Sequence, residues 1–287
     1  MESRSWYLLF LPVFAVIGLV EVYPLILSAY LSFTNLNGVP ALANYITLAS
    51  DPAFFSALNV SLFYSLASTI IAVAIGLGLT YILTQSLPGK RVFEATYLLP
   101  LAVTPIVVGV LFSPSSVWDD VQQFSHFILG FPYFNELTPI FYFPVMIFSE
   151  SWEWAPLILL VAMSISTNIP KEVFEAAESH GASTLQKFRM VILPAILKSP
   201  VMQFVIVLRF IDAMRAFEIP LAWSNWLGYT TTPGSPVDTI SLYLYKLLFA
   251  SSQGFPIGVV SAAALTLFAI TFAGAVVLLR ILKAVGG

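Results

Sequence analysis

The sequence predicts an all-α protein that crosses the membrane with six transmembrane helices. The chain has 287 residues, of which 59% are hydrophobic and only 9% are charged, and its mean hydropathy is +0.90. An average soluble domain carries roughly 25% charged residues, so this composition excludes an ordinary soluble fold. Six long apolar runs make up most of the chain, and each is long enough for a bilayer-spanning helix, which needs about 20 residues.

The six apolar runs follow one another with short polar connections. They cover residues 6–33, 58–85, 95–117, 141–165, 201–223 and 247–279. We expect the first run to be a retained span, because it is about twice as long as the apolar core of a secretory signal. Prolines inside several runs predict kinks, since neighbouring membrane helices can satisfy the freed backbone groups. The second run contains Gly76 and Gly78, which we interpret as helix-packing positions.

The positions of the cations predict the orientation of the chain. Most of the Lys and Arg residues lie before the first run, between the second and third, between the fourth and fifth, or after the sixth. The connections on the opposite side contain only one cation, Lys246. Because Lys and Arg concentrate in cytoplasmic loops, we expect a multi-pass protein of the cell membrane with both termini in the cytoplasm.

Scarce residue types exclude several functions. The chain has no cysteine and only two histidines, His126 and His180. It therefore lacks thiolate ligands and the usual acid–base groups, and we expect no metal site and no catalytic residues. The absence of clustered positive charge argues against a nucleic-acid partner. No change of composition divides residues 1–287, so we expect a single transmembrane domain.

One external connection is expected to be helical. Residues 117–129 place apolar side chains at helical spacing, opposite acidic and amide side chains. This pattern is typical of an amphipathic helix at the outer membrane interface. A packed connecting helix without a role in recognition explains the same pattern.

The longest cytoplasmic connection, at about residues 168–198, predicts two short helices. Asn168 is a candidate cap for the first, and Gly181 suits a left-handed stop at its end. Ser183 and Gln186 stand at the spacing of a capping box for the second, and Pro194 is expected to end it. The first helix also carries a small apolar face that needs a surface to pack against. This face consists of Val173, Phe174 and Ala177.

The same connection carries a spaced motif. Glu175, Ala176 and Ala177 are followed after three residues by Gly181, and after nine more by Val-Ile-Leu-Pro at 191–194. This spacing resembles the EAA loop of ABC importer permeases, with Val191 where that family prefers Ile. The N-terminal part is also similar to the maltose- and glycerol-3-phosphate-type first permeases of binding-protein-dependent sugar importers. The segments that carry this similarity are Leu11-Pro12, Tyr23-Pro24-Leu25, Leu31-Ser32-Phe33-Thr34, Asn44-Tyr45 and Asp51-Pro52-Ala53-Phe54.

The resemblance implies a type I importer transmembrane domain. In that family the loop is a coupling helix that docks on a cytoplasmic ATPase subunit. Carried over, Glu175, Ala176, Ala177 and Gly181 form the docking surface, and Leu193 with Pro194 sets the return into the fifth span. The chain has no phosphate-binding loop motif, so ATP and Mg belong to the partners and the chain itself is a transport subunit, not an enzyme. The implied partners are a second permease in a heterodimer, two ATPase subunits, an external solute-binding protein and a sugar.

Charged residues inside two of the runs mark a candidate substrate pathway. Ionisable groups within a membrane are costly and usually face a cavity or each other. The fifth run carries four charges at a spacing of three, alternating in sign, and the fourth carries two carboxylates beside tryptophans. We expect Glu218 to be only a pairing partner, because it lies nearer the outer face. The pathway candidates are Glu150, Glu153, Trp154, Arg209, Asp212 and Arg215.

Other interpretations of these charges stay open. They also fit a structural network of ion pairs that holds the spans together. Among solutes, a polyamine or a glycerol phosphate is an alternative to a sugar, although four acidic groups against two basic groups do not favour a phosphate. A membrane subunit without a transport role is the remaining alternative.

Overall fold

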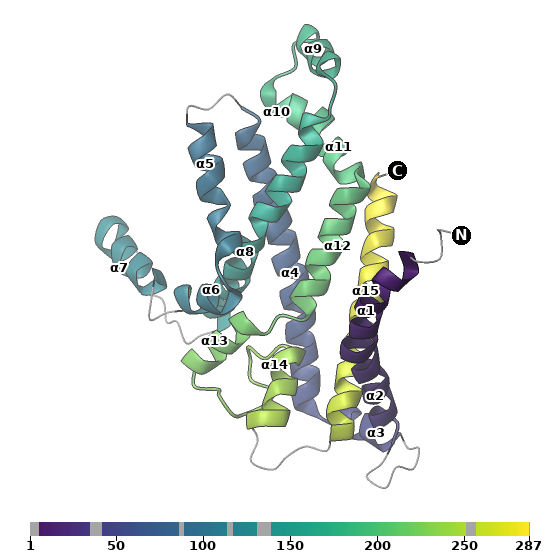
Figure 1. Ribbon diagram of the computed structural model, residues 1–287. Coiled ribbons are helices and arrows are strands. Elements are labelled where there is room, and N and C mark those ends of the chain that lie inside the picture. The colour runs from purple at the N-terminus through teal and green to yellow at the C-terminus, as the bar shows by residue number, and fades with distance from the viewer. Residues whose placement is uncertain are drawn as a thin grey trace.

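The computed structural model describes residues 6–34, 42–85, 89–113, 117–130, 139–250 and 257–286. Its elements are helices, and the long ones run along one another in a bundle (Figure 1). Helix α9 (Lys171–Ser179) projects from one end of this bundle, and α3 (Ala43–Ala49) lies at the other. The all-α prediction is therefore confirmed.

Within the described ranges, four single helices have the length and hydropathy of a membrane span. They are Phe10–Ser32, Pro52–Leu83, Tyr142–Thr167 and Ile257–Ala284. The first combines α1 (Trp6–Ile17), a π-helical turn (Gly18–Val22) and α2 (Tyr23–Ser32), and the others belong to α4 (Pro52–Leu83), α8 (Pro139–Thr167) and α15 (Ile257–Gly286). A fifth span meets the same test only as a pair of helices, Thr184–Lys198 and Pro200–Trp226, with a bend of 69° between them. The count of six spans remains a prediction.

Two of the expected spans are divided differently from the apolar runs. In place of one helix, the third run contains the end of α5 (Lys90–Tyr97), a 3-10 turn (Leu99–Ala102) and α6 (Pro105–Leu111). Pro100 and Pro105 each remove a backbone donor there, which explains the breaks. The start of the sixth run belongs to the π-helical segment Lys246–Ala250, which follows α14 (Ile240–Tyr245), and α15 begins only at Ile257.

Helix α4 is the centre of the bundle and packs against α8 and α12 (Pro200–Met214). Its buried side includes small residues that allow close approach to α8. A Cβ atom built on Gly76 lies 2.6 Å from the Cβ atom of Ile158, so only glycine fits there without a shift. The packing role predicted for Gly76 is confirmed, whereas Gly78 has open space around it and packs against no helix within the described part of this chain.

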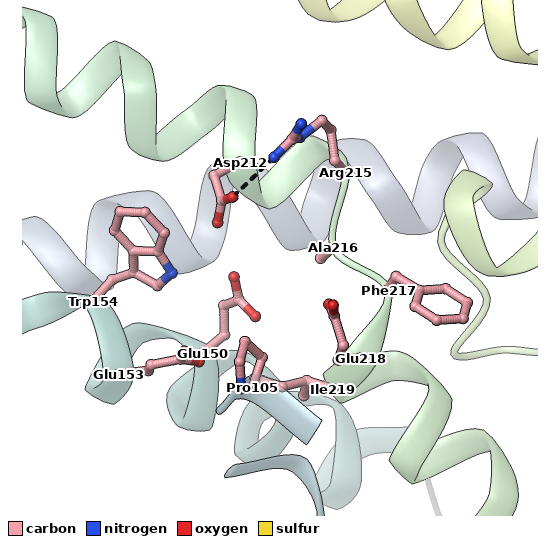
Figure 2. A pocket seen from close by; sticks show the side chains of 10 residues that line it. All are labelled: Pro105, Glu150, Glu153, Trp154, Asp212, Arg215, Ala216, Phe217, Glu218 and Ile219. Atoms are coloured by element: carbon pink, nitrogen blue, oxygen red, sulfur yellow. Dashed lines mark ion pairs between the residues drawn. The ribbon is translucent and has the colours of Figure 1, made fainter. Parts of the chain in front are cut away.

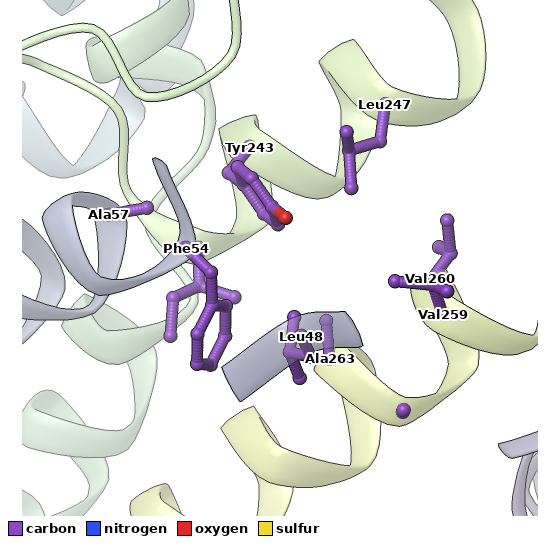
Figure 3. Close-up of a cluster of buried hydrophobic side chains, with 10 residues drawn as sticks. Leu48, Phe54, Ala57, Tyr243, Leu247, Val259, Val260 and Ala263 are labelled. Carbon is purple, nitrogen blue, oxygen red and sulfur yellow. The ribbon is translucent and has the colours of Figure 1, made fainter. Parts of the chain in front are cut away.

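The end of the bundle away from α9 is closed by an apolar cluster that joins α3, α4, α14 and α15 (Figure 3). Leu48, Phe54, Tyr243 and Val259 are each buried within it. Because this cluster includes one face of α14, that short helix is fixed to the long helices beside it.

Helix α7 (Val117–Leu129) forms where an amphipathic helix was expected. It lies apart from the long helices in Figure 1. The apolar side chains of Phe124 and Phe127 are exposed, the latter by 86%. A location at the membrane interface stays a prediction.

Candidate functional site

The loop with the spaced motif folds into the two helices that its caps predict. Helix α9 begins after Pro170, and the Asn168 amide donates to the carbonyl of Ser164 in the preceding helix, so the expected cap at Asn168 was wrong. At the other end Gly181 has φ +74°, and the N–H of Ala182 donates to the carbonyl of Ala177 over 3.0 Å. This is the expected left-handed stop.

The second short helix, α10 (Thr184–Lys187), has the predicted capping box. The Gln186 N–H donates to Ser183 Oγ over 3.3 Å, and the Ser183 N–H donates to Gln186 Oε1 over 2.7 Å. Lys187 Nζ lies 2.7 Å from Glu178 Oε1 and ties α10 to α9. The two short helices are therefore linked by one ion pair at the surface.

The helical segment that begins with α10 does not end at Pro194, so that expectation was wrong. A π-helical segment (Phe188–Ile192) leads directly into α11 (Leu193–Lys198), where Pro194 occupies the first turn. A proline costs little in a first turn, because its missing N–H has no partner in the helix there. The bend comes at Ser199, just before Pro200 begins α12.

The coupling candidates differ in exposure. Helix α9 has no buried residue, and both Glu175 and Ala176 are exposed, whereas Ala177 is half-buried. Phe174 packs on an apolar cluster at the base of the loop, together with Leu193. The loop is thus anchored through Phe174 and Leu193 and presents Glu175 and Ala176 to solvent.

The charges of the fourth and fifth runs meet in the interior of the bundle. Arg209 on α12 is completely buried, and its Nη2 atom lies 3.0 Å from Glu150 Oε1 on α8. The same guanidinium group donates to Ser68 Oγ over 3.1 Å and lies 5.0 Å from the ring centre of Trp154. The Tyr64 hydroxyl donates to the other Glu150 oxygen over 3.0 Å. Three helices, α4, α8 and α12, are joined through these contacts.

A cavity of about 380 Å³ opens beside this buried group (Figure 2). Asp212 in its wall lies 3.6 Å from Arg209 and 3.5 Å from Arg215, so alternating charges on α12 do pair. One buried oxygen of Glu153 has no hydrogen-bond partner. The lining consists of Pro105, Glu150, Glu153, Trp154, Asp212, Arg215, Ala216, Phe217, Glu218 and Ile219.

The structure therefore brings the six pathway candidates together but gives them different surroundings. Five of them line the cavity, and Arg209 lies behind its wall. Glu218, on α13 (Glu218–Trp226), also lines the cavity, and within the described part of the chain it forms no ion pair. The expectation that Glu218 is a pairing partner was wrong, because α12 ends at Met214 and the turn that follows separates Glu218 from Arg215.

Sequence reasoning missed Tyr64 and Ser68, which hold the buried ion pair from α4. Both lie in the second apolar run, which contains no charged residue that would indicate a polar site. The available signal was a series of hydroxyl groups at helical spacing, Ser61, Ser65 and Ser68, all of which are buried.

The cavity can form many hydrogen bonds with a polar solute. Carboxylates accept from hydroxyl or ammonium groups, and the guanidinium group of Arg215 donates in a planar fork. Trp154 adds an aromatic wall. Such a mixed lining suits a solute rich in hydroxyl groups.

Comparison with known proteins shows that the chain is similar to transport permeases. No protein-family model matches it. It is 27% identical to the trehalose/maltose transport system permease protein MalF of Thermococcus litoralis, with 98% of this chain and 94% of that protein covered. It is 28% identical to the arabinooligosaccharides transport system permease protein AraP of Bacillus subtilis, with 83% and 78% covered.

The fold has counterparts among solved structures. The chain matches a crystal structure of a bacterial ABC transporter involved in the import of the acidic polysaccharide alginate, with a TM-score of 0.81 and 19% identity. This match covers 98% of the chain and 96% of its counterpart. The resemblance to the permeases of sugar ABC importers, first seen in the motif of residues 175–194, therefore holds along nearly the whole chain and in its fold.

Proposed function

We propose that this chain is a permease subunit of a binding-protein-dependent ABC sugar importer and forms half of its translocation pathway. The observation that carries the proposal is the polar cavity between α8, α12 and α13. Helix α8 directly precedes α9 in the chain, and α12 follows it after α10, a π-helical segment and α11. The relatives named for trehalose/maltose and arabinooligosaccharides support a saccharide as the solute.

Helix α9 is the proposed contact with the cytoplasmic ATPase subunits, which bind ATP and Mg. It contains no buried residue and projects from the end of the bundle at which α5 begins and α15 ends (Figure 1). These ends carry Lys90 and Lys283, so this end is the cytoplasmic one on the basis of its positive charge.

A displacement of α9 can reach the cavity through the short segments that connect α9 to α12. α10, the π-helical segment and α11 follow one another without a break until Ser199, and α12 begins at the next residue. Asp212 and Arg215 lie on the last turn of α12 and just beyond it, so a displacement of the loop changes their position relative to Glu153 on α8. The proposal is that ATP-driven closure of the ATPases reorients the cavity through this route.

A second permease is proposed to cover the open side of the cavity. The side chain of Arg215 is 69% exposed, and it also lines an apolar groove of about 360 Å³ between α12 and α15. This groove lies at residues 264–275, the middle of α15. A guanidinium group facing lipid at that depth is costly, so a protein surface is the expected neighbour.

The test is reconstitution of the chain in liposomes with its second permease, ATPase subunits and binding protein. We expect maltose, trehalose or an arabinooligosaccharide to stimulate ATP hydrolysis and to accumulate inside the liposomes. Stimulation by spermidine alone, or by glycerol phosphate alone, would replace the sugar with the corresponding solute. No stimulation by any of these solutes would contradict the importer function.

A further inference from the structure

The turn between α12 and α13 forms part of the cavity wall. Among the described contacts, the side chain of one residue, Thr239, forms a hydrogen bond with the backbone of this turn. Residues 215–217 make this turn, and all three line the cavity. The hydroxyl of Thr239 donates to the carbonyl of Ala216 over 2.6 Å, across 23 residues of sequence. Thr239 is completely buried, whereas Ala216 is half-buried and lines the cavity.

Thr239 itself is held in place from two directions. It is the N-cap of α14, where its Oγ1 accepts from the N–H of Leu242. The next residue, Ile240, donates its N–H to Ser61 Oγ on α4 over 2.8 Å. Helix α14 is also fixed by the apolar cluster around Tyr243, whose hydroxyl donates to Asp51 at the start of α4 (Figure 3).

The connection that leads to Thr239 is fixed by a buried ion pair. Lys246 Nζ lies 2.7 Å from Asp238 Oδ1, and both side chains are almost completely buried. Asp238 also accepts from the N–H groups of Gly234 and Ser235, over 2.9 and 3.1 Å. A buried ion pair with this many hydrogen bonds defines one conformation for residues 234–238.

Gly234 brings the same connection against α4. It has φ +82°, and a Cβ atom built on it lies 2.5 Å from the Cβ atom of Ala53. The tip of the connection, by contrast, is exposed at Tyr229, Thr230 and Thr231. The connection is therefore closely packed where it approaches α4 and accessible to solvent at its tip.

We propose that Thr239 is a positioning residue of the solute pathway. Its hydroxyl group holds the Ala216 carbonyl and thereby sets the position of Arg215 and Glu218 at the cavity. The buried Lys246–Asp238 pair keeps Thr239 at the required place. The assignment rests on the proposed function, because it treats this cavity as the pathway.

The main test replaces the hydroxyl group with a methyl group in Thr239→Val, which keeps the shape of the side chain. We expect the sugar concentration for half-maximal uptake to rise about tenfold, because the Ala216 carbonyl loses the donor that holds the turn in place. Thr239→Ser keeps the hydroxyl group and should restore the value to within about twofold. An unchanged value in Thr239→Val, or a Thr239→Ser variant as defective as Thr239→Val, would overturn the proposal.

The matched control is Thr80→Val. Thr80 is also completely buried, but its hydroxyl donates over 2.8 Å to the carbonyl of Gly76 in its own helix. We expect the same half-maximal concentration as in the unmodified chain. If both variants reduce only the yield of complex and leave uptake per complex unchanged, the role of Thr239 is stability alone and the proposal is wrong.

Two further arms cover failure of the main variant or of the importer itself. Should Thr239→Val not assemble, Thr239→Cys keeps a weaker donor, and a smaller rise in the half-maximal concentration is expected; no rise contradicts the proposal.

The chain has no native cysteine, so Glu218→Cys gives its only thiol. Maleimide modification of that thiol, followed by the mass of this chain in the purified complex, should be several times faster with Thr239→Val than with Thr239→Ser. Equal rates overturn the proposal even if the complex transports no sugar.

Discussion

Glu150 and Arg209 form an ion pair of 3.0 Å that joins α8 to α12 inside the bundle. The Arg209 side chain has no exposed surface and that of Glu150 has only 6%. Ser68 and Tyr64 of α4 each bond one partner of the pair, so the contact joins three helices at one point.

Removal of one charge from this pair should destabilise the complex strongly. Arg209→Met leaves the Glu150 carboxylate buried without its counter-charge, and we expect a loss of about 3–5 kcal/mol in the free energy of unfolding. Thermal unfolding of the purified complex measures the effect. The double variant Glu150→Leu/Arg209→Met carries no unpaired charge and should recover most of the loss. A double variant as unstable as the sum of the two single variants would contradict this account.

The unpaired carboxylates of the cavity should affect uptake more than stability. In Glu153→Gln and Glu218→Gln we expect the half-maximal sugar concentration to rise about tenfold, because a charged acceptor for the solute is lost. The unfolding temperature should stay the same, since neither carboxylate forms an ion pair within the described residues. Asp120→Asn, on the exposed helix α7, is the control and should leave uptake unchanged. Equal uptake in all three variants would show that these carboxylates do not contact the solute.

Two glycines of α4 offer a matched pair for the packing of α4 on α8. Gly76→Ala places a methyl group against Ile158, and we expect a loss of about 1–3 kcal/mol in stability. Gly78→Ala meets open space and should gain up to about 1 kcal/mol from helix propensity. Thermal unfolding of the two complexes compares them directly. Equal shifts would mean that the close approach at Gly76 is absent in the membrane.

The stop at Gly181 should be needed for coupling. Gly181→Val forces a β-branched residue to φ +74°, which costs at least about 1–2 kcal/mol locally and moves α9 relative to α10. We expect the complex to assemble but ATP hydrolysis to lose its link to uptake. Gly89→Val has the same backbone strain at φ +75° and open space around it, at the start of α5. Sugar uptake per ATP hydrolysed should fall only in Gly181→Val, and an equal fall in both would remove the special role of the α9 stop.

Hydropathy predicted a span correctly where the apolar run forms one continuous helix. α4 corresponds to the second run but begins at Pro52, because the Asp51 carboxylate accepts the N–H of Ala53 and starts the helix earlier. Prolines could not be interpreted in the same way. Pro144 and Pro156 lie inside the continuous helix α8, whereas Pro105 begins a new helix after the 3-10 turn. Hydropathy alone does not separate these outcomes, because the packing of each helix against its neighbours decides between a kink and a break.

The candidate site was predictable where it is made of charges, because charges are rare in apolar runs. Glu153 and Asp212 were found for that reason. The cavity wall formed by the turn after Met214 was not, because an apolar run gives no sign that its helix ends part of the way along. The partnership of Tyr64 with Glu150 spans 86 residues and depends on the register of two packed helices. No pattern within a single run contains that register.

The exposed guanidinium group of Arg215 also affects how stable the chain is in the membrane before assembly. A copy inserted without its partner must keep this group hydrated by thinning the bilayer or by drawing in water, and each is unfavourable. Copies without a partner are therefore expected to be less stable in the membrane than assembled copies. If the proposed second permease covers Arg215, the cellular amount of this chain should then follow the supply of that permease.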